Sequence, residues 1–370
     1  MFRFAVSGVF AVWFSMLAGL AQAAVSSPVG GVQEPASVVF LNPGYSNEPF
    51  WVGYTEFMQA AADDLGIRLR VVYGERDPKL LLSRARDVLE SPEPPDYLVF
   101  VNEMYTAPEL LRLFAESPIK LFSLHSTLTP AQQRIVGGTR ERYRNWIGSL
   151  VPNDEEAGYL MATALIDKLH GQSGAMLAFS GVRNTPSATL REQGMQRALA
   201  EHPEIKLQQL MYGEWSRQRA YEQARVLLPR YADLSLVWSA NDEMAFGAMR
   251  AAQELGRQPG KDLHFSALNN SEEVFNARVE GQLCVLVGGH FTLGGWAMVL
   301  LHDYHAGQDF AARGGKDRVA PLFRLIDAEQ ASRLSKRLKV PGYGLDFRQY
   351  SAVYRPAIKD YRFSITALLQ

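Results

Sequence analysis

Two successive series of short apolar runs, each run followed by an amphipathic stretch, dominate the sequence between residues 37 and 305. Apolar runs of about four to eight residues are typical of buried strands, and longer amphipathic stretches are typical of helices. We expect strands at residues 37–42, 67–73, 97–101, 119–124, 175–179, 206–211, 234–238, 263–268 and 281–289. We expect helices at residues 49–65, 77–90, 107–116, 154–169, 187–200, 217–231, 242–255 and 293–305.

This alternation predicts an α/β fold, because parallel strands need crossover connections and these are usually helices that cover both faces of the sheet. The series restarts near residues 149–153, which indicates two successive α/β lobes. A chain of 370 residues is long enough for two such lobes. After Gly307 the periodicity is lost. Residues 322–326 are a candidate strand, and the pattern places none of the residues that follow them.

Composition excludes several classes of protein. Hydrophobic residues make up 47% of the chain and charged residues 21%, which is globular rather than disordered composition. The net charge is −1, so no overall positive field attracts nucleic acid or an anionic membrane. Four arginines lie between Arg134 and Arg144, but only Tyr143 interleaves with them, and we interpret this segment as a solvated loop. We therefore expect no nucleic-acid partner.

The first residues resemble an export signal. Arg3 precedes an apolar run at residues 4–20, and Ala21-Gln22-Ala23 fits the small-residue pattern of a cleavage site. Residues 1–23 are therefore interpreted as a cleaved signal peptide and the protein as periplasmic; an uncleaved membrane anchor and a buried helix remain alternatives. Cys284, the only cysteine, is too far from this site to carry a lipid, and it has no partner for a disulfide.

Ligands of open parallel sheets bind beyond the carboxyl ends of the strands, where loops lead into helices. In this chain those loops carry aromatic residues, amides and few ionisable groups. The candidate ligand-binding residues are Glu48, Phe50, Trp51, Asn102, His125, Arg191, Trp215, Asn241, Asn269 and His290.

This set of side chains suits a small polyhydroxylated ligand such as a sugar. Aromatic faces cover the C–H patches of a sugar ring, and Asn and Arg offer paired hydrogen-bonding atoms that match neighbouring hydroxyls. Each residue also has a purely structural alternative. A strand-end Asn often caps the next helix, and Trp51 and Trp215 could instead belong to the core.

At these loops the sequence resembles the type I periplasmic binding proteins, the ribose and galactose receptor class that shares its fold with lactose-repressor-type cores. The resemblance covers about residues 37–307 and rests on residues 47–51 (NEPFW), Asn102, residues 191–194 (REQG), Trp215 and residues 241–248 (NDEMAFGA). It implies two doubly wound parallel-sheet lobes joined by a hinge of three segments, near residues 149–153, 285–290 and Ala320. The implied lobes are residues 37–150 with 286–319, and residues 151–285 with 320–370.

The resemblance also implies roles for the candidate residues. Phe50 and Trp51 would sandwich a sugar ring from one lobe and Trp215 from the other, while Asn102, Arg191, Asn241 and Asn269 would hold hydroxyls. Four positions depart from the ribose-binding pattern: Glu48 replaces an Asn, His125-Ser126 an Asp-Arg pair, Asn269 an Asp, and Gly288-Gly289 lies where a Gln is expected. The resemblance therefore leaves the identity of the sugar open. It implies a monomer that passes its ligand to an ABC permease or, alternatively, is read by a membrane sensor, as in autoinducer-2 and sugar receptors.

Catalytic and metal-binding alternatives have weaker support. The sequence has no Gly-x-Ser-x-Gly elbow, and Cys284 lies in an apolar strand. Glu48 and Asp242 could form an acid–base pair across a cleft, but acceptors for ligand hydroxyls are the favoured interpretation. His302 and His305 are spaced to share a metal, yet no third ligand lies nearby. No phosphate-binding loop is present. We expect no enzymatic activity, no metal and no cofactor.

Overall fold

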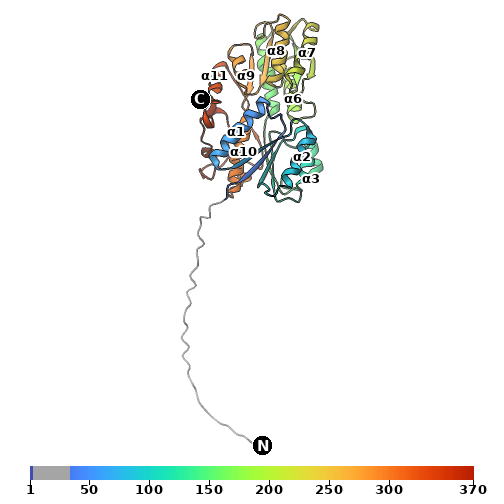
Figure 1. Ribbon diagram of the computed structural model, residues 1–370. Helices are drawn as coiled ribbons and strands as arrows, with labels where there is room; N and C mark the ends of the chain where they lie inside the picture. Colours follow the sequence, from blue (N-terminus) through green and yellow to red (C-terminus); the bar gives the residue numbers. More distant parts are fainter. Residues whose placement is uncertain (3–33) are drawn as a thin grey trace. The chain divides into compact units, whose positions relative to one another are not determined.

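Two parallel sheets organise the computed structural model, which describes residues 1–2 and 34–370. Residues 35–370 form one compact unit that contains both sheets (Figure 1). The predicted signal peptide, apart from Met1 and Phe2, lies outside the described residues. Within the described part of the chain, no helix has both the length and the apolar character needed to cross a membrane.

The first sheet is wholly parallel, with the strand order β11-β5-β4-β3-β1-β2. Alternate residues of β1 point to opposite faces. Val38 and Phe40 belong to the core that contains residues of α1, whereas Val39 and Leu41 pack with residues of α2 and α3. The strands are β1 (Ser37–Asn42), β2 (Arg68–Tyr73), β3 (Tyr97–Phe100), β4 (Lys120–Leu124), β5 (Trp146–Pro152) and β11 (Asp317–Ala320). The helices of this lobe are α1 (Pro49–Leu65), α2 (Pro78–Leu89), α3 (Ala107–Leu113), α4 (Pro130–Val136) and α10 (Leu293–His305).

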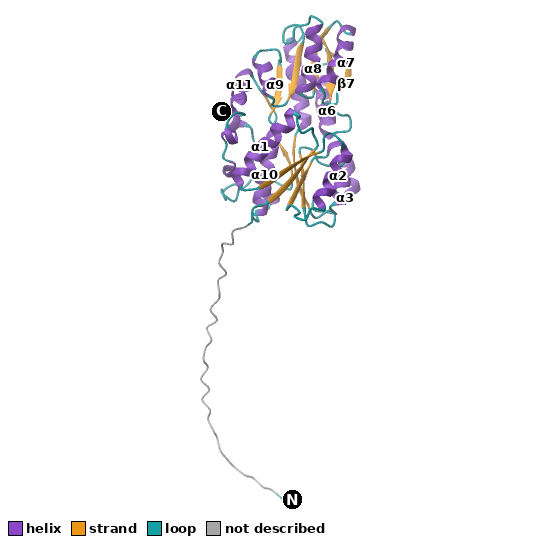
Figure 2. Ribbon diagram, in the orientation of Figure 1, coloured by secondary structure: helices purple, strands orange, loops and turns teal. Residues whose placement is uncertain are grey.

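The second sheet has the strand order β12-β10-β9-β8-β6-β7, parallel except for β12, the antiparallel edge strand. Figure 2 shows the strands in orange among the purple helices. Its strands are β6 (Gly174–Ser180), β7 (Ile205–Tyr212), β8 (Leu234–Ser239), β9 (His264–Leu268), β10 (Val285–Gly288) and β12 (Arg324–Leu325). Its helices are α5 (Asp154–Ile166), α6 (Pro186–Glu201), α7 (Arg217–Arg230), α8 (Asp242–Glu254) and α9 (Glu272–Val279). The predicted α/β fold with two parallel-sheet lobes is confirmed.

The first two helices of the first lobe begin where local sequence chemistry favours them. Pro49 occupies the first turn of α1, where its missing N–H costs no hydrogen bond. The Asp77 side chain caps α2 by accepting hydrogen bonds from the backbone N–H groups of Lys79 and Leu80. Each of these helices begins a few residues after the carboxyl end of a strand, so the loops that precede them lie at the same edge of the first sheet.

The chain passes between the two sheets three times. β5 belongs to the first sheet, and α5, which follows Asn153, packs against β8, β9 and β10 of the second. β10 belongs to the second sheet, and after residues 289–292 α10 packs against α1 of the first lobe. Residues 321–323 then join β11 of the first sheet to β12 of the second.

The C-terminal residues contact both lobes. Helix α11 (Ala328–Arg337) packs on α9, whereas Phe347 is buried against Phe57 of α1 and Trp296 of α10. Asp303 of α10 is fully buried and accepts a 2.7 Å hydrogen bond from the Tyr361 hydroxyl. The predicted boundary assigned residues 320–370 to the second lobe. Within that range β12 and α11 contact the second lobe, whereas the aromatic side chains of residues 343–363 pack on helices of the first.

Candidate functional site

A cavity lies between the two lobes, at the ends of the strands where the sequence placed the binding loops. Every candidate residue except Asn102 contributes to its wall. The lining residues are Glu48, Phe50, Trp51, Arg76, Glu103, His125, Ser187, Arg191, Trp215, Asn241, Asn269 and His290. The sequence interpretation missed Arg76, Glu103 and Ser187. Trp51 from the first lobe and Trp215 with Asn241 from the second therefore do converge on one cavity.

Strained backbone is concentrated in the loops around this cavity. Non-glycine residues with positive φ include the consecutive pairs Glu75-Arg76, Met104-Tyr105 and Glu214-Trp215, together with His125 and Asn269. Such conformations are unfavourable for residues with a Cβ atom and are typically kept at functional sites. Their positions independently support this cavity as the functional site of the fold.

Aromatic rings form the first-lobe wall. Phe50 stacks on the imidazole of His290, with centroids 4.7 Å apart, and meets Trp51 edge-on at 5.0 Å. Trp51 is only 2% exposed, and its indole lies so close to Gly44 that a Cβ there would be 2.0 Å from a ring carbon. Trp51 therefore serves mainly as core packing beneath Phe50, and Phe50 presents the aromatic surface.

Trp215 and Arg191 form the opposing wall. The Trp215 ring packs against Gly181, where a Cβ would be 2.0 Å from the indole, so a side chain at Gly181 would displace it. The Arg191 guanidinium carbon lies 5.6 Å from the centre of that ring. Its Nε donates to Asp154 at 2.7 Å, and its Nη1 donates to the Ala240 carbonyl at 2.8 Å. Two of the three guanidinium nitrogens of Arg191 thus form hydrogen bonds within the second lobe.

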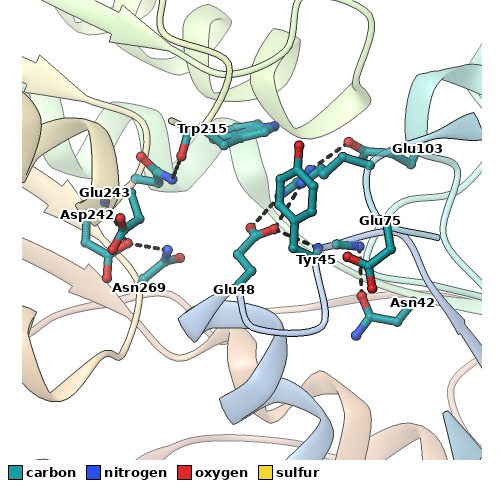
Figure 3. Close-up of polar contacts among 12 residues, drawn as sticks. Asn42, Tyr45, Glu48, Glu75, Glu103, Trp215, Asp242, Glu243 and Asn269 are labelled. Carbon is teal, nitrogen blue, oxygen red and sulfur yellow. Dashed lines mark hydrogen bonds and ion pairs between the residues drawn. The ribbon is translucent and has the colours of Figure 1, made fainter. Parts of the chain in front are cut away.

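An ionic triad forms one side of the cavity mouth. Arg76 donates from Nε to Glu48 at 3.0 Å and from Nη1 to Glu103 at 2.9 Å, so one guanidinium bridges two carboxylates. Both carboxylates are labelled in Figure 3. Burial raises the pKa of Glu103, partly offset by Arg76. Burial lowers the pKa of Arg76, but the two carboxylates outweigh this effect and the net direction is upward. Glu48 and Glu103 are therefore both paired with Arg76 and are not independent carboxyl groups.

The asparagines have more structural roles than the sequence suggested. Asn102 is outside the cavity wall: its amide donates to the Thr127 carbonyl and to Gln132, and its oxygen accepts from the Ala107 N–H. Its contact with a ligand stays a prediction that the cavity does not support, because these hydrogen-bonding groups are used by the local fold. Asn241 lines the cavity, yet it caps α8 at the Met244 N–H.

Asn269 and Asp242 form a buried pair beside the cavity. The Asn269 amide donates to Asp242 at 2.7 Å, and the Ser271 hydroxyl donates to the same carboxylate at 2.7 Å. Burial raises the pKa of Asp242 to about 6. Asp242 therefore faces these partners, and Glu48 is bound to Arg76, so the two carboxylates do not form the acid–base pair that the sequence left open. No group of three or more His, Cys, Asp and Glu side chains suited to a metal occurs among the described residues.

Two neutral imidazoles complete the inner wall. Burial lowers the pKa of His125 to about 3 and holds the pKa of His290 well below its usual value, so both rings are uncharged at neutral pH. Nδ1 of His125 and both ring nitrogens of His290 are buried without a hydrogen-bond partner. A neutral imidazole offers one donor and one acceptor, which is the combination that a hydroxyl group matches.

A wider cleft adjoins the inner cavity and shares Glu48, Arg76, Glu103 and Trp215 with it. The inner cavity has a volume of about 30 Å³, whereas the cleft measures about 810 Å³. The Tyr45 side chain is 50% exposed, and its ring extends from the first-lobe loop toward the loop that carries Trp215 (Figure 3). The cleft is thus the route between the inner cavity and solvent.

Two α/β lobes with three connections and a cavity between the carboxyl ends of their sheets define the class of two-lobed periplasmic binding proteins. A family model described as periplasmic binding protein domain matches residues 149–309. A periplasmic sugar-binding protein of Pseudomonas fluorescens, known from its crystal structure, is 51% identical, with a TM-score of 0.83 over 90% of this chain and 100% of that chain. The chain belongs to the type I periplasmic sugar-binding protein family.

More distant relatives agree with this family. The ribose import binding protein of Escherichia coli (strain K12) is 24% identical over 71% of this chain and 83% of its own length. The galactofuranose-binding protein of the same strain is 20% identical over 73% of this chain and 82% of its own. A crystal structure of a galactofuranose binding protein superposes with a TM-score of 0.70 at 19% identity, which supports the fold alone; the superposition covers 84% of this chain and 100% of that one.

Proposed function

We propose that this protein is a periplasmic receptor that captures a sugar or related polyol between its lobes and presents it to an ABC importer. The main support for this proposal is the cavity, where Phe50 and Trp215 come from different lobes and hydrogen-bonding groups lie between them. Aromatic faces with neutral and charged hydrogen-bonding partners suit a ring that carries several hydroxyls. The relatives whose names include ribose and galactofuranose bind ligands of this kind.

Closure of the lobes is the mechanism that we infer. A cavity of about 30 Å³ is far too small for a sugar ring, so a ring enters only when the walls move apart. A ligand that contacts both walls binds the closed arrangement better than the open one, and it shifts the population by that difference in affinity. The closed shape would then be what a permease recognises. The proposal includes export through the N-terminal signal, the lobes joined at the three connections, and a monomeric receptor.

The proposed ligand contacts are Glu48, Phe50, His125, Arg191, Trp215, Asn241, Asn269 and His290, with Arg76, Glu103 and Ser187 added from the cavity wall. Trp51 and Asn241 act in part by supporting their neighbours, since both have structural contacts within one lobe. Arg191 retains one terminal nitrogen, Nη2, for a ligand hydroxyl after its contacts with the protein.

A calorimetric titration of the purified protein against pentoses, hexoses, polyols and amino acids tests the proposal. A sugar or polyol should bind, and Trp215→Ala should weaken that binding by about 1–3 kcal/mol because an aromatic face is lost. The matched control is Tyr354→Ala, an exposed aromatic of the C-terminal segment outside the cavity. Binding of amino acids but of no sugar or polyol would refute the ligand class, and equal effects of both variants would refute the site.

A further inference from the structure

We propose that His290 is the residue through which a bound ligand holds the hinge closed, and that its unpaired ring nitrogens destabilise the protein until a ligand hydroxyl binds them. This inference rests on the proposed function, because it concerns how the same cavity is regulated.

His290 lies where two of the three connections between the lobes touch. It follows Gly289, which comes directly after β10 and has a φ of 126° that disfavours any other residue. A Cβ at Gly289 would be 2.1 Å from the Leu322 carbonyl oxygen, so the second connection packs on the backbone of the third. A change in the position of His290 is therefore transmitted directly to the residues that must bend when the lobes move.

The imidazole also contacts each part of the closing mechanism. It stacks on Phe50 of α1 at 4.7 Å on the first-lobe side, and its centroid lies 4.9 Å from that of Phe323 in the third connection. The same ring lines the cavity. His290 is thus placed between the ligand, the first lobe and the hinge, whereas Trp215 and Arg191 contact the ligand space from the second lobe.

The unpaired ring nitrogens of His290 link ligand binding to the stability of the protein. His290 is 1% exposed, and neither nitrogen has a hydrogen-bond partner. Buried polar atoms are almost always paired, and an unpaired one is costly. Burial, followed by the charge on Arg191, lowers the pKa of His290, so the ring stays neutral and offers one donor and one acceptor. A hydroxyl can satisfy either nitrogen, whereas an ammonium group could only donate and a carboxylate could only accept.

These observations predict opposite effects on stability and function for one substitution. His290→Phe keeps a ring between Phe50 and Phe323 but removes both unpaired nitrogens. The unliganded protein should then melt at the same or a higher temperature than the wild type. Its sugar affinity should fall at least about tenfold, which corresponds to one lost hydrogen bond to a buried group.

The experiment measures melting temperature without ligand, dissociation constant, and the decrease in radius of gyration on adding the sugar, by small-angle X-ray scattering. His290→Gln, which retains a donor and an acceptor, should keep more affinity and compaction than His290→Phe. The control is His264→Phe, which lies at the start of β9, the opposite end of that strand from Asn269, and should bind as the wild type.

Wild-type affinity and full compaction in His290→Phe would overturn the inference, as would a clearly lower melting temperature in that variant with normal folding of His264→Phe. If His290→Phe fails to fold, His290→Leu, which also lacks a donor and an acceptor, takes its place: lower affinity and less compaction in His290→Leu than in His290→Gln supports the coupling, and equal values in the two variants refute it. A wild-type protein that binds no sugar or polyol refutes the proposed function instead. The melting temperature of unliganded His290→Phe still tests the cost of the unpaired nitrogens in that case.

Discussion

Replacing Arg191 by methionine should destabilise the fold as well as weaken binding, because this arginine neutralises a buried carboxylate. Arg191 and Asp154 are 3% and 2% exposed, and their Nε and Oδ1 atoms are 2.7 Å apart. Arg191→Met retains much of the apolar volume of the side chain but leaves Asp154 with no positive partner. Removing one member of a buried pair typically costs about 3–5 kcal/mol. That is a large part of the roughly 5–15 kcal/mol by which folded proteins are stable.

The pH dependence of this loss has a defined sign. Burial already raises the pKa of Asp154, and the loss of the guanidinium raises it further. A carboxyl group whose pKa is raised on folding costs stability once the pH exceeds its pKa in the unfolded chain, and protonation relieves this cost as the pH falls. Arg191→Met should therefore lose more stability relative to the wild type at pH 8 than at pH 5.

Urea unfolding followed by tryptophan fluorescence at both pH values checks this reasoning. Arg191→Met/Asp154→Asn removes both charges and should recover most of the loss at pH 8. The control is Arg217→Met: the Arg217 side chain is 40% exposed, and its pairs with Glu243 and Glu273 should contribute less than the buried pair of Arg191 with Asp154. A double variant no more stable than Arg191→Met, or a loss that does not change with pH, would contradict the argument.

Three further predictions concern the same elements. Gly181→Ala should lower sugar affinity in a calorimetric titration, because its Cβ would be 2.0 Å from the Trp215 ring and would displace it. Asp303→Ala should make the C-terminal segment more sensitive to limited proteolysis, because the Tyr361 hydroxyl and nearby backbone lose their buried acceptor. The stability of the wild type relative to Asp242→Asn should fall by about 3 kcal/mol as pH rises from 3.5 to 7, because burial raises the pKa of Asp242 to about 6. Urea titrations across that range measure this change, and a rise instead of a fall would refute it.

The architecture and the location of the site were predictable from the sequence because both depend on periodic patterns. Alternation of strands and helices fixes which ends of the strands carry the loops, and the loop residues from both series then converge on one cavity. β5 was missed as a strand, since it follows directly on the arginine-rich loop and no separate apolar run marks its start. The packing of the C-terminal segment could not be predicted from the sequence, because Phe347 is buried through contacts with residues distant in the sequence.

The role of each side chain was less predictable than its position. Asn102 and Asn241 both follow strands and precede helices, and a capping Asn and a ligand-binding Asn look the same in the sequence. Only the structure shows that the Asn102 amide donates its hydrogen bonds to Thr127 and Gln132. Arg76 and Glu103 were missed because charged residues in loops are common. Their position next to predicted strand ends was the one available signal.

The C-terminal segment restricts where the hinge can bend. After α11, which packs on the second lobe, Phe347 and Tyr361 are anchored on the first lobe. Ile365 then returns to Gly289 at the second connection: a Cβ at that glycine would be 3.1 Å from Ile365. Separation of the lobes must therefore either detach buried aromatic side chains or bend the short stretches that join the anchored parts. Because detachment would expose apolar surface at about 25 cal/mol per Å², bending of residues 338–340 and of Ser364, which lies between the buried Phe363 and Ile365, is the cheaper route. These stretches should accordingly move together with the three connections between the sheets.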